Sequence, residues 1–448
     1  MQECLSPLEL AFHWPLITVR AFIDILGVNH LRQSTLCTAT ATTSFFSGIG
    51  TSELAWKAIA AALAQFGVHC CLRQTFACEH DPVCQVLLLA HTSGHIFADL
   101  LDMISAPGLI GCSSFEQKHA ATRSAAVRLS AWCCRHGARC PVSGGDIDTS
   151  GSPCQDWSTA GLRRGCEGER VHLLLLWMRW HRVMETPIII HENVKGFDLK
   201  MLTTFLGDLY VAWHVEVGPE HVGWPCCKRP RLYVALLHRR KVRLHCDPVH
   251  LFWLVSSRLP ASLRVRDCLI ASAAEIQYEI RKRSRHSAAA VRGMRLAAAA
   301  PRQLIPESQL TSYERVRSLN YASLWRHRYG TEAHTERDLI FNLGDNPCGG
   351  WLTWSAPSTG AIHRVPTFRR HWTAQWLPHQ QRWLTSNERL VCMGFPAHPG
   401  LAVCYGMSET YCLTWEQRHT LGNAMHLANI GVWQACIAAS TSLMQGAA

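Results

Sequence analysis

The sequence predicts an α/β fold built on a mostly parallel central sheet, together with a smaller and less regular second unit. Three observations lead to this prediction. Strand-like and helical patterns alternate over residues 42–241, this rhythm fades after about Arg243, and a helical pattern returns near Glu388. Alternating strands and helices are typical of parallel sheets. With 448 residues, 48% hydrophobic and 17% charged, the chain is long enough for two domains and is globular rather than disordered.

Two strand–helix units open the predicted sheet. "TTSFFSGIG" at residues 42–50 indicates a short strand that enters a glycine turn. Residues 51–67 indicate the helix that follows, with Ser52 as its N-cap. "VHCCLRQTFACE" at residues 68–79 then predicts a second strand, and "PVCQVLLLAHT" at residues 82–92 predicts a second helix.

Later elements complete the sheet and begin the second unit. "VHLLLLWM" at residues 171–178 is too short to span a membrane and predicts a buried helix. "TPIIIHENV" at residues 186–194 and "RLYVALLHR" at residues 231–239 predict strands of the buried type. The basic, Ala-rich stretch 276–303 is expected to be helical in part, and residues 422–440 are expected to form a helix.

Positive charge is concentrated in one segment. Residues 228–302 hold 17 Lys/Arg against 4 Asp/Glu, in a chain of net charge +11. This asymmetry favours a surface that faces nucleic acid over a merely solvated basic loop. Within it, "RKRSR" (Arg281–Arg285) fits either phosphate contacts or a nuclear-import signal, and the sequence leaves both open.

Composition also predicts the compartment. No run of about 18 uncharged apolar residues predicts a membrane span. Glu3 and Glu9 precede the first arginine, so the positive region of a secretory signal is missing. We therefore expect an intracellular protein, nuclear if the source is eukaryotic, whose 21 cysteines are mostly reduced and buried. Since no C-x-x-C pair occurs, the usual zinc pattern is absent and we expect no metal site.

The first glycine turn is a candidate ligand site. "FSGIG" places Gly48 and Gly50 between a strand and a helix, where backbone N–H groups can approach a ligand. Glu79 stands at the end of the next predicted strand, and an acidic residue there can accept both ribose hydroxyls of a nucleoside. An ordinary surface Glu is the alternative. Together the two features favour a nucleoside-cofactor site.

A candidate nucleophile lies in "GSPCQDWSTAG". Cys154 stands among Pro and Gly in a loop, whereas structural cysteines prefer regular elements. The strand "PIIIH" then delivers Glu192 and Asn193 to the mouth of the sheet, where α/β enzymes carry out catalysis. Glu192 as a simple turn residue is the alternative. Arg229 and Arg231 alternate as they enter a strand, so that one can reach the site while the other braces loops; a plain basic strand entrance is the alternative.

In this order, the motifs resemble those of the C5-cytosine DNA methyltransferases. "FSGIG" resembles the first motif, "SPCQDWS" the Pro-Cys-Gln nucleophile motif, "ENVKGF" the Glu-Asn-Val motif and "KRPR" the end of the eighth motif. "NERLVCMGFPAHP" resembles the ninth motif and "GNAM" the tenth. The chain departs from the family pattern at Thr51, at Cys226–Cys227 and at Ala424.

The resemblance implies a Rossmann-like methyltransferase fold and a reaction. Cys154 would attack C6 of a flipped-out cytosine, Glu192 would protonate N3 and Arg231 would steady the base oxygen. Arg229 and Asn193 belong to the same motifs, and Asn193 would order the loops. The cofactor would be S-adenosyl-L-methionine. The residues implied to bind it are Phe46, Gly48, Gly50, Glu79, Asp99, Pro153, Leu173 and Asn423.

The resemblance also divides the chain. We expect an N-terminal extension (1–41), a catalytic domain in two parts (42–241 and 386–448) and, between them, a target-recognition domain (242–385). The expected partner is double-stranded DNA, contacted at its phosphates by the basic segment. Two alternatives remain: an RNA cytosine-5 methyltransferase, although the Cys-Phe-Thr tripeptide of the tRNA-modifying branch is missing, and a non-catalytic DNA-binding relative.

Overall fold

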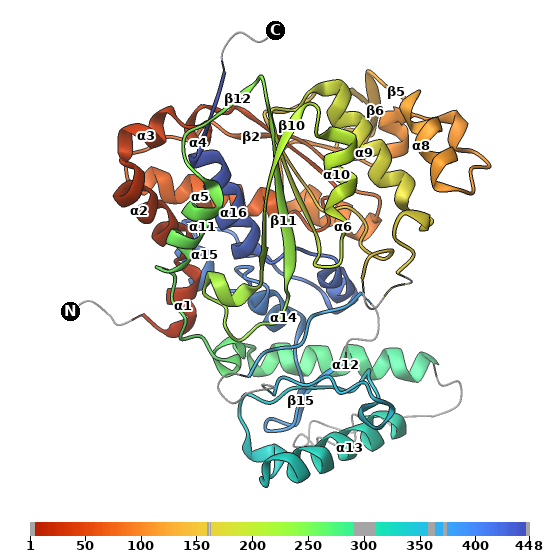
Figure 1. Cartoon of the computed structure of the whole chain (residues 1–448). Helices are drawn as coiled ribbons and strands as arrows, with labels where there is room; N and C mark the ends of the chain where they lie inside the picture. The colour runs from red at the N-terminus through yellow and green to blue at the C-terminus, as the bar shows by residue number, and fades with distance from the viewer. Residues whose placement is uncertain are drawn as a thin grey trace.

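The computed structural model describes residues 5–158, 161, 163–290, 310–356, 363–370 and 374–444, with backbone alone for 284–290. Its centre is a nine-stranded sheet in the order β10-β11-β9-β8-β1-β2-β3-β6-β7 (Figure 1). The strands are β1 (Ala41–Phe45), β2 (Arg73–Cys78), β3 (His95–Phe97), β6 (Ser130–Cys133), β7 (Ala138–Pro141), β8 (Ile147–Ser150), β9 (Ile188–Val194), β10 (Tyr210–Val217) and β11 (Arg231–His238). β3, β2, β1, β8 and β9 pair in parallel, which confirms the predicted α/β fold.

Helices cover both faces of this sheet (Figure 1). One face packs against α2 (Trp14–Leu26), α5 (Thr51–Gln65), α11 (Pro248–Ser256) and α16 (Leu427–Ala439); the other packs against α8 (Phe115–Arg123), α9 (Val171–Met184) and α10 (Leu199–Leu206). Strand β9 shows how the sequence serves both layers. Ile188 and Ile190 enter the first hydrophobic core, on the side of α5 and α16. Ile189 enters the second core, on the side of α9, because alternate side chains of a strand point to opposite faces. The run of three isoleucines is therefore buried on both sides.

The remaining elements are shorter or peripheral. The helices are α1 (Pro7–Phe12), α3 (Val28–Gln33), α4 (Thr35–Thr38), α6 (Pro82–His91), α7 (Leu100–Met103), α12 (Ala273–Ala290), α13 (Ser312–Tyr329), α14 (Ser386–Cys392) and α15 (Pro399–Cys404). The strands are β4 (Ile104–Ser105), β5 (Ala126–Val127), β12 (Val242–Leu244), β13 (Phe341–Asn342), β14 (Gln375–Leu377), β15 (Arg382–Trp383) and β16 (Thr441–Leu443). Among the described residues, no helix combines the length and apolarity that crossing a membrane requires.

Two details differ from the sequence prediction. Ser52 does not cap α5: the N-cap is Gly50 in the left-handed conformation, and the Ser52 hydroxyl instead donates to Gln434 Oε1 at 3.3 Å. A positive φ of 80° at this turn is open to glycine at little cost, so the glycine takes the cap position. The predicted strand at residues 68–79 is also too long, because β2 begins only at Arg73.

The N-terminal segment, in which the sequence shows no clear pattern, folds into α1–α4 against the C-terminal part of the chain. Ser6 and Glu9 form a capping box that starts α1. The Trp14 indole donates to the Tyr405 hydroxyl at 2.8 Å. The Trp14 ring also lies directly on Gly431, where an added Cβ would come within 2.1 Å of it. The segment is thus part of the first hydrophobic core.

A small unit lies below the central sheet in Figure 1 and has its own core. It combines α13 with the three-stranded sheet β13-β14-β15. Thr311 and Glu314 form the capping box that starts α13. Tyr321 of α13 stacks on Phe341 of β13, with ring centroids 4.9 Å apart. The unit falls within the expected target-recognition domain, whose boundaries stay a prediction.

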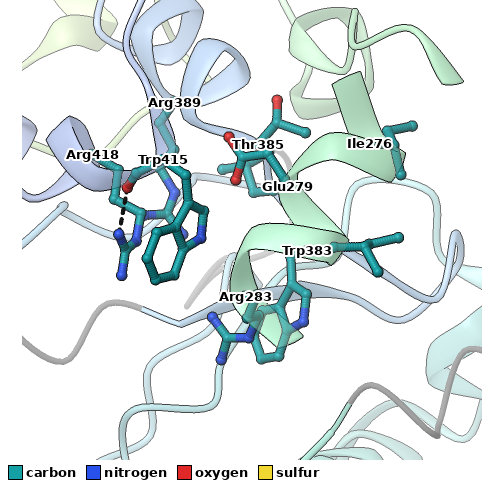
Figure 2. Close-up of a pocket in the computed structure, with 10 residues that line it drawn as sticks. Ile276, Glu279, Arg283, Trp383, Thr385, Arg389, Trp415 and Arg418 are labelled. Atoms are coloured by element: carbon teal, nitrogen blue, oxygen red, sulfur yellow. Dashed lines mark hydrogen bonds between the residues drawn. The ribbon is translucent and has the colours of Figure 1, made fainter. Parts of the chain in front are cut away.

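Helix α12 runs between the central sheet and the small unit. A solvent-open pocket of about 360 Å³ lies where α12 meets β15, α14 and the 3₁₀ helix η8 (Trp415–Gly422). Figure 2 shows residues that line it. The Arg283 guanidinium lies 3.6 Å from the centroid of the Trp383 ring, and that of Arg418 lies 3.4 Å from the Trp415 ring. Such stacking holds the two arginines within the joint.

Candidate active site

The connections of the sheet create a crevice beside β1. From β1, the sheet continues through β2 and β3 on one side and through β8 and β9 on the other. Open α/β sheets bind ligands outside the carboxyl ends of the strands at such a switch point. A cavity of about 340 Å³, open to solvent, lies there. Its lining residues are Ser44, Phe46, Ser47, Gly48, Thr51, Ser52, Thr149, Gly151, Glu192, Asn423, Ala424 and Met425.

The glycine turn after β1 shapes one wall of this cavity. Phe46 has a φ of 53°, an uncommon value for a non-glycine residue, and Gly48 has a φ of 56°. The Gly48 N–H donates to Glu79 Oε2 at 2.7 Å, and the Asp81 N–H donates to Glu79 Oε1 at 2.8 Å. Burial raises the pKa of Glu79 despite these hydrogen bonds. The carboxylate at the end of β2 therefore holds the turn in place.

The predicted cofactor residues divide into two groups. Phe46, Gly48 and Asn423 line the cavity; Gly50 caps α5 and Glu79 braces the turn. The other three do not appear in the lining. Asp99 follows β3 and caps α7 by accepting from the Leu101 N–H at 2.9 Å, Pro153 stands in the loop after β8, and Leu173 is half-buried in α9.

At the opposite wall, Glu192 meets Arg231. The two lie on paired strands, β9 and β11, and Arg231 Nε is 3.0 Å from Glu192 Oε1. Glycine at position 151 makes room for this pair: a Cβ there would come within 3.2 Å of Glu192 Oε2 and 2.8 Å of Met425 Cε. The carboxylate thus faces the cavity with a cation on one side and the start of the Cys154 loop on the other.

Burial acts in the same direction on the Cys154 thiol and on the Glu192 carboxyl. It raises the pKa of Cys154, while the positive charges of Arg231 and Arg229 work against this rise. It also raises the pKa of Glu192, again against the pull of Arg231. The thiol is half-buried in a turn, where its backbone carbonyl accepts from the Ser158 N–H at 2.9 Å. The structure therefore brings Cys154, Glu192 and Arg231 close enough for their charges to interact.

Asn193 ties the end of β9 to the loop that carries Cys154. Its Nδ2 donates to Ser152 Oγ at 3.0 Å and to the Ser152 carbonyl at 3.2 Å. Ser152 Oγ also contacts His191 Nε2 at 2.9 Å. Burial lowers the pKa of His191 to about 3, so this imidazole is neutral. All three side chains are buried, which fixes the loop at its entry.

Arg229 is a brace for distant backbone segments. Its guanidinium donates to the carbonyls of Phe368 at 3.4 Å and Gly422 at 3.2 Å, and also to that of Ala424. Burial lowers the pKa of Arg229 to about 9. Of the two arginines that alternate at the strand entrance, Arg231 therefore contacts the carboxylate and Arg229 holds the loops, the division of labour that strand alternation predicts.

Sequence reasoning missed a buried pair beneath the cavity. Asp148 of β8 and His181 of α9 are fully buried, with Asp148 Oδ1 3.3 Å from His181 Nε2. Thr43 donates to Asp148 Oδ2 at 2.8 Å. Asp148 in the short strand "IDTS" was the available signal, because a carboxylate inside a central strand needs partners. The pair joins β1, β8 and α9 below the switch point.

Comparison with known proteins locates the family signal at this same site. A sequence model described as C-5 cytosine-specific DNA methylase matches residues 141–206, which include Cys154, Glu192 and Asn193. No curated protein matches the chain.

Three solved structures illustrate the structural likeness. One is a putative DNA modification methyltransferase encoded within an E. coli prophage (14% identity, TM-score 0.44, covering 89% of this chain and 98% of that one). Another is the S. pombe Dnmt2 methyltransferase (13% identity, TM-score 0.43, covering 88% of this chain and 96% of that one). The third is the Entamoeba histolytica methyltransferase EhMeth (12% identity, TM-score 0.44, covering 89% of this chain and 97% of that one). The match of the family model to residues 141–206 confirms the resemblance inferred from the motifs, and this chain carries there the signature of the C-5 cytosine-specific DNA methylases.

Proposed function

We propose that the protein is a DNA (cytosine-5-)-methyltransferase that forms a covalent adduct between Cys154 and C6 of cytosine. The observation that carries this proposal is the buried Glu192–Arg231 pair beside the Cys154 thiol. C6 of a neutral cytosine is a poor electrophile, so attack requires acid assistance on the ring. A carboxyl whose pKa is raised by burial retains the proton that such assistance requires.

Each of the three residues has a separate task in the proposed reaction. The Cys154 thiolate forms the bond to C6, and Glu192 delivers a proton to N3 as the ring takes up the electron pair. Arg231 keeps the Glu192 carboxyl oriented and contacts the base oxygen. Once C5 has taken up the methyl group, loss of its proton to solvent expels the Cys154 thiolate, the N3 proton returns to Glu192, and the aromatic ring is restored. Asn193 serves as a positioning residue, because its side-chain hydrogen bonds to the described residues reach only Ser152 and its own strand.

The cavity beside β1 fits S-adenosyl-L-methionine in its chemistry. Gly48 opens the turn to close approach, the Glu79 carboxylate can accept ribose hydroxyls, and Phe46 offers an aromatic face. When bound, the cofactor supplies an electrophilic methyl group. Asn423, Ala424 and Met425 would close the cavity from the C-terminal side, where Arg229 holds the backbone.

Duplex DNA is the proposed substrate. The target carbon of a paired cytosine is hidden in the stack, so the base must be extruded into the crevice at a cost of a few kcal/mol. The small unit and the basic segment 228–302 are proposed to hold the duplex during this step. The lack of the Cys-Phe-Thr tripeptide that marks the tRNA-modifying branch of the family favours DNA over RNA.

Trapping on a duplex that contains 5-fluorocytosine tests the covalent step. With S-adenosylmethionine present, fluorine at C5 cannot leave as a proton does, so a competent thiol stays attached to the DNA. We expect a denaturant-resistant complex for the wild type and for Cys166→Ser, a half-buried thiol in the same region. Cys154→Ser should give none. Absence of a complex with the wild type, under conditions where the cofactor binds, would refute the proposal.

Transfer of labelled methyl groups separates the two nucleic acids. The same preparation is offered duplex DNA and tRNA in parallel reactions. Incorporation into DNA is expected. Incorporation into tRNA alone would replace the DNA assignment by the RNA one, while the trapping result would still establish the nucleophile.

A further inference from the structure

We propose that His95, Cys133, His136 and Cys140 form a structural zinc site at the edge of the central sheet. His95 lies on β3, Cys133 on β6, Cys140 on β7 and His136 in the turn between β6 and β7. One ligand atom from each residue lies within 4.8 Å of every other. The cluster lies outside the cavity described above and none of its members belongs to the proposed reaction.

The spacing of the ligand atoms fits a tetrahedral zinc ion. His136 Nδ1 is 3.2 Å from Cys140 Sγ and 3.5 Å from Cys133 Sγ, and His95 Nδ1 is 3.7 Å from Cys133 Sγ. Tetrahedral angles with Zn–S of about 2.3 Å and Zn–N of about 2.0 Å place neighbouring S and N ligands ~3.5 Å apart. A Cys₂His₂ set is also among the commonest ligand sets of structural zinc. Small shifts of the side chains would therefore complete the coordination.

Strand register explains why the four side chains meet. Phe97 is paired with Cys133, and His95 lies two residues before Phe97 on the same face of β3. Cys133 and Cys140 are diagonal neighbours on one face of the β6–β7 hairpin, because Cys133 pairs with Ala138 and Ala131 pairs with Cys140. That face is buried.

The residues around the cluster can stabilise a metal-bound thiolate and leave the cluster accessible to an ion from solvent. The Ile96 N–H points to Cys133 Sγ at 3.4 Å, as expected of a hydrogen bond that supports a metal-bound thiolate. Arg135 donates to the carbonyls of Gly94 and Thr92, at 2.8 and 2.7 Å, and holds the turn against the start of β3. His136 is exposed, so an ion can reach the cluster from solvent.

Four protein ligands leave no open position, which indicates a structural rather than a catalytic ion. Its task would be to fasten the β6–β7 hairpin to β3. In the described chain, β3 and β6 share a single registered pair, Phe97 with Cys133, so the ladder between the two strands is short. Asp99 lies two residues after the end of β3, and the metal would thereby steady the strand that leads to it.

Metal content and cobalt substitution test the site in the full chain. The protein is purified under reducing conditions, and its zinc content is measured by inductively coupled plasma mass spectrometry. We expect one zinc per chain. After removal of zinc, added Co²⁺ should give the visible absorption of a tetrahedral ion, with the thiolate-to-cobalt band in the near ultraviolet. No stoichiometric zinc, together with an octahedral cobalt spectrum, would overturn the proposal.

Matched variants assign the metal to these residues. Cys133→Ser and His136→Gln should weaken zinc binding by more than about 100-fold, since even outer-shell partners are worth about 10–100-fold. Because His136 is exposed, its variant should keep the fold, as judged by circular dichroism. Cys134→Ser is the control: this neighbouring thiol packs toward the small cluster of Ala77, Leu88 and Ile96 and should keep its zinc.

Thermal melting adds a readout that is independent of activity. A chelator should lower the melting temperature of the wild type and of Cys134→Ser, and should leave that of His136→Gln unchanged. Equal loss of zinc in Cys134→Ser and Cys133→Ser would refute the assignment. So would a Cys133–Cys140 disulfide that persists in reducing buffer, because it would consume both thiolates.

Discussion

Glu192 and Cys154 need opposite protonation states for the proposed reaction. The thiol must lose its proton and the carboxyl must keep one, yet burial raises the pKa of both groups. Burial therefore helps Glu192 and hinders Cys154. Arg231 and Arg229 reduce the cost for the thiol, because their charges stabilise the thiolate.

The pH dependence of Cys154 alkylation measures this balance. Mass spectrometry of the Cys154 peptide after iodoacetamide pulses should give a midpoint above the ordinary thiol pKa of 9.0, since burial raises the pKa. Arg231→Gln should move the midpoint further up by removing a stabilising cation. Glu192→Gln should move it down by removing a neighbouring negative charge. Opposite shifts, or no shift in either variant, would contradict the described electrostatics.

At the residue scale, sequence predicts the groups that sit in short, contiguous motifs. Cys154 and Glu192 stand in such motifs, and the structure brings them close enough for the charge of Glu192, which lines the cavity, to act on the thiol. His95 and Cys133 carry no such signal, because their meeting depends on the pairing of β3 with β6, 38 residues apart. The absence of C-x-x-C predicted no metal site, but a sheet edge can gather ligands from three strands.

At the element scale, the brace at Arg229 joins the entrance of β11 to the segment after η8. Replacing Arg229 by methionine leaves buried carbonyls without hydrogen-bond donors. Each unsatisfied carbonyl lowers the free energy of unfolding by about 1–3 kcal/mol. We expect Arg229→Met to lower the free energy of unfolding by about 2–4 kcal/mol in urea titrations. Lys228→Met changes an exposed neighbour and should have little effect. Equal stability of the two variants would show that the brace is dispensable.

Elements with strong periodicity were predictable, whereas pairing partners were not. The residue patterns of six elements predict their type, strand or helix, correctly: β1, α5, α6, α9, β9 and β11. β6 and β7 have four residues each, too few for a clear period, and the direction of β11 against β9 depends on long-range packing. Residues 291–303 of the basic stretch lie outside the described ranges.

At the scale of the whole molecule, the basic segment raises the question of which charges are available to DNA. Lys282 pairs with Glu416 at 2.8 Å, and Arg283 pairs with Glu314 and stacks on Trp383. Arg281 is exposed on α12. Of the run Arg281–Arg285, two cations are thus engaged within the protein, and the side chain of Arg285 lies outside the described residues.

The salt dependence of DNA affinity tests this distinction. Each phosphate contact contributes about one unit to the slope of log K against log salt. Arg281→Gln should reduce the slope by about 1, and Lys282→Gln should reduce it less because of its ion pair. Arg20→Gln on α2, a solvent-exposed arginine far from the basic segment in sequence, is the control and should leave the slope unchanged. A slope that all three variants leave unaltered would remove α12 from the DNA interface.

The contact of Trp14 with Tyr405 has a consequence for how the chain is made. The two residues are 391 positions apart, and Gly431, on which the Trp14 ring lies, is translated later still. On the ribosome, α1 and α2 therefore emerge long before their partners have been synthesised. Until then the Trp14 indole lacks the residues against which it packs in the folded protein. Such distant contacts slow folding and leave apolar surface open to aggregation. The nascent chain is thus expected to need a chaperone until α16 has been synthesised.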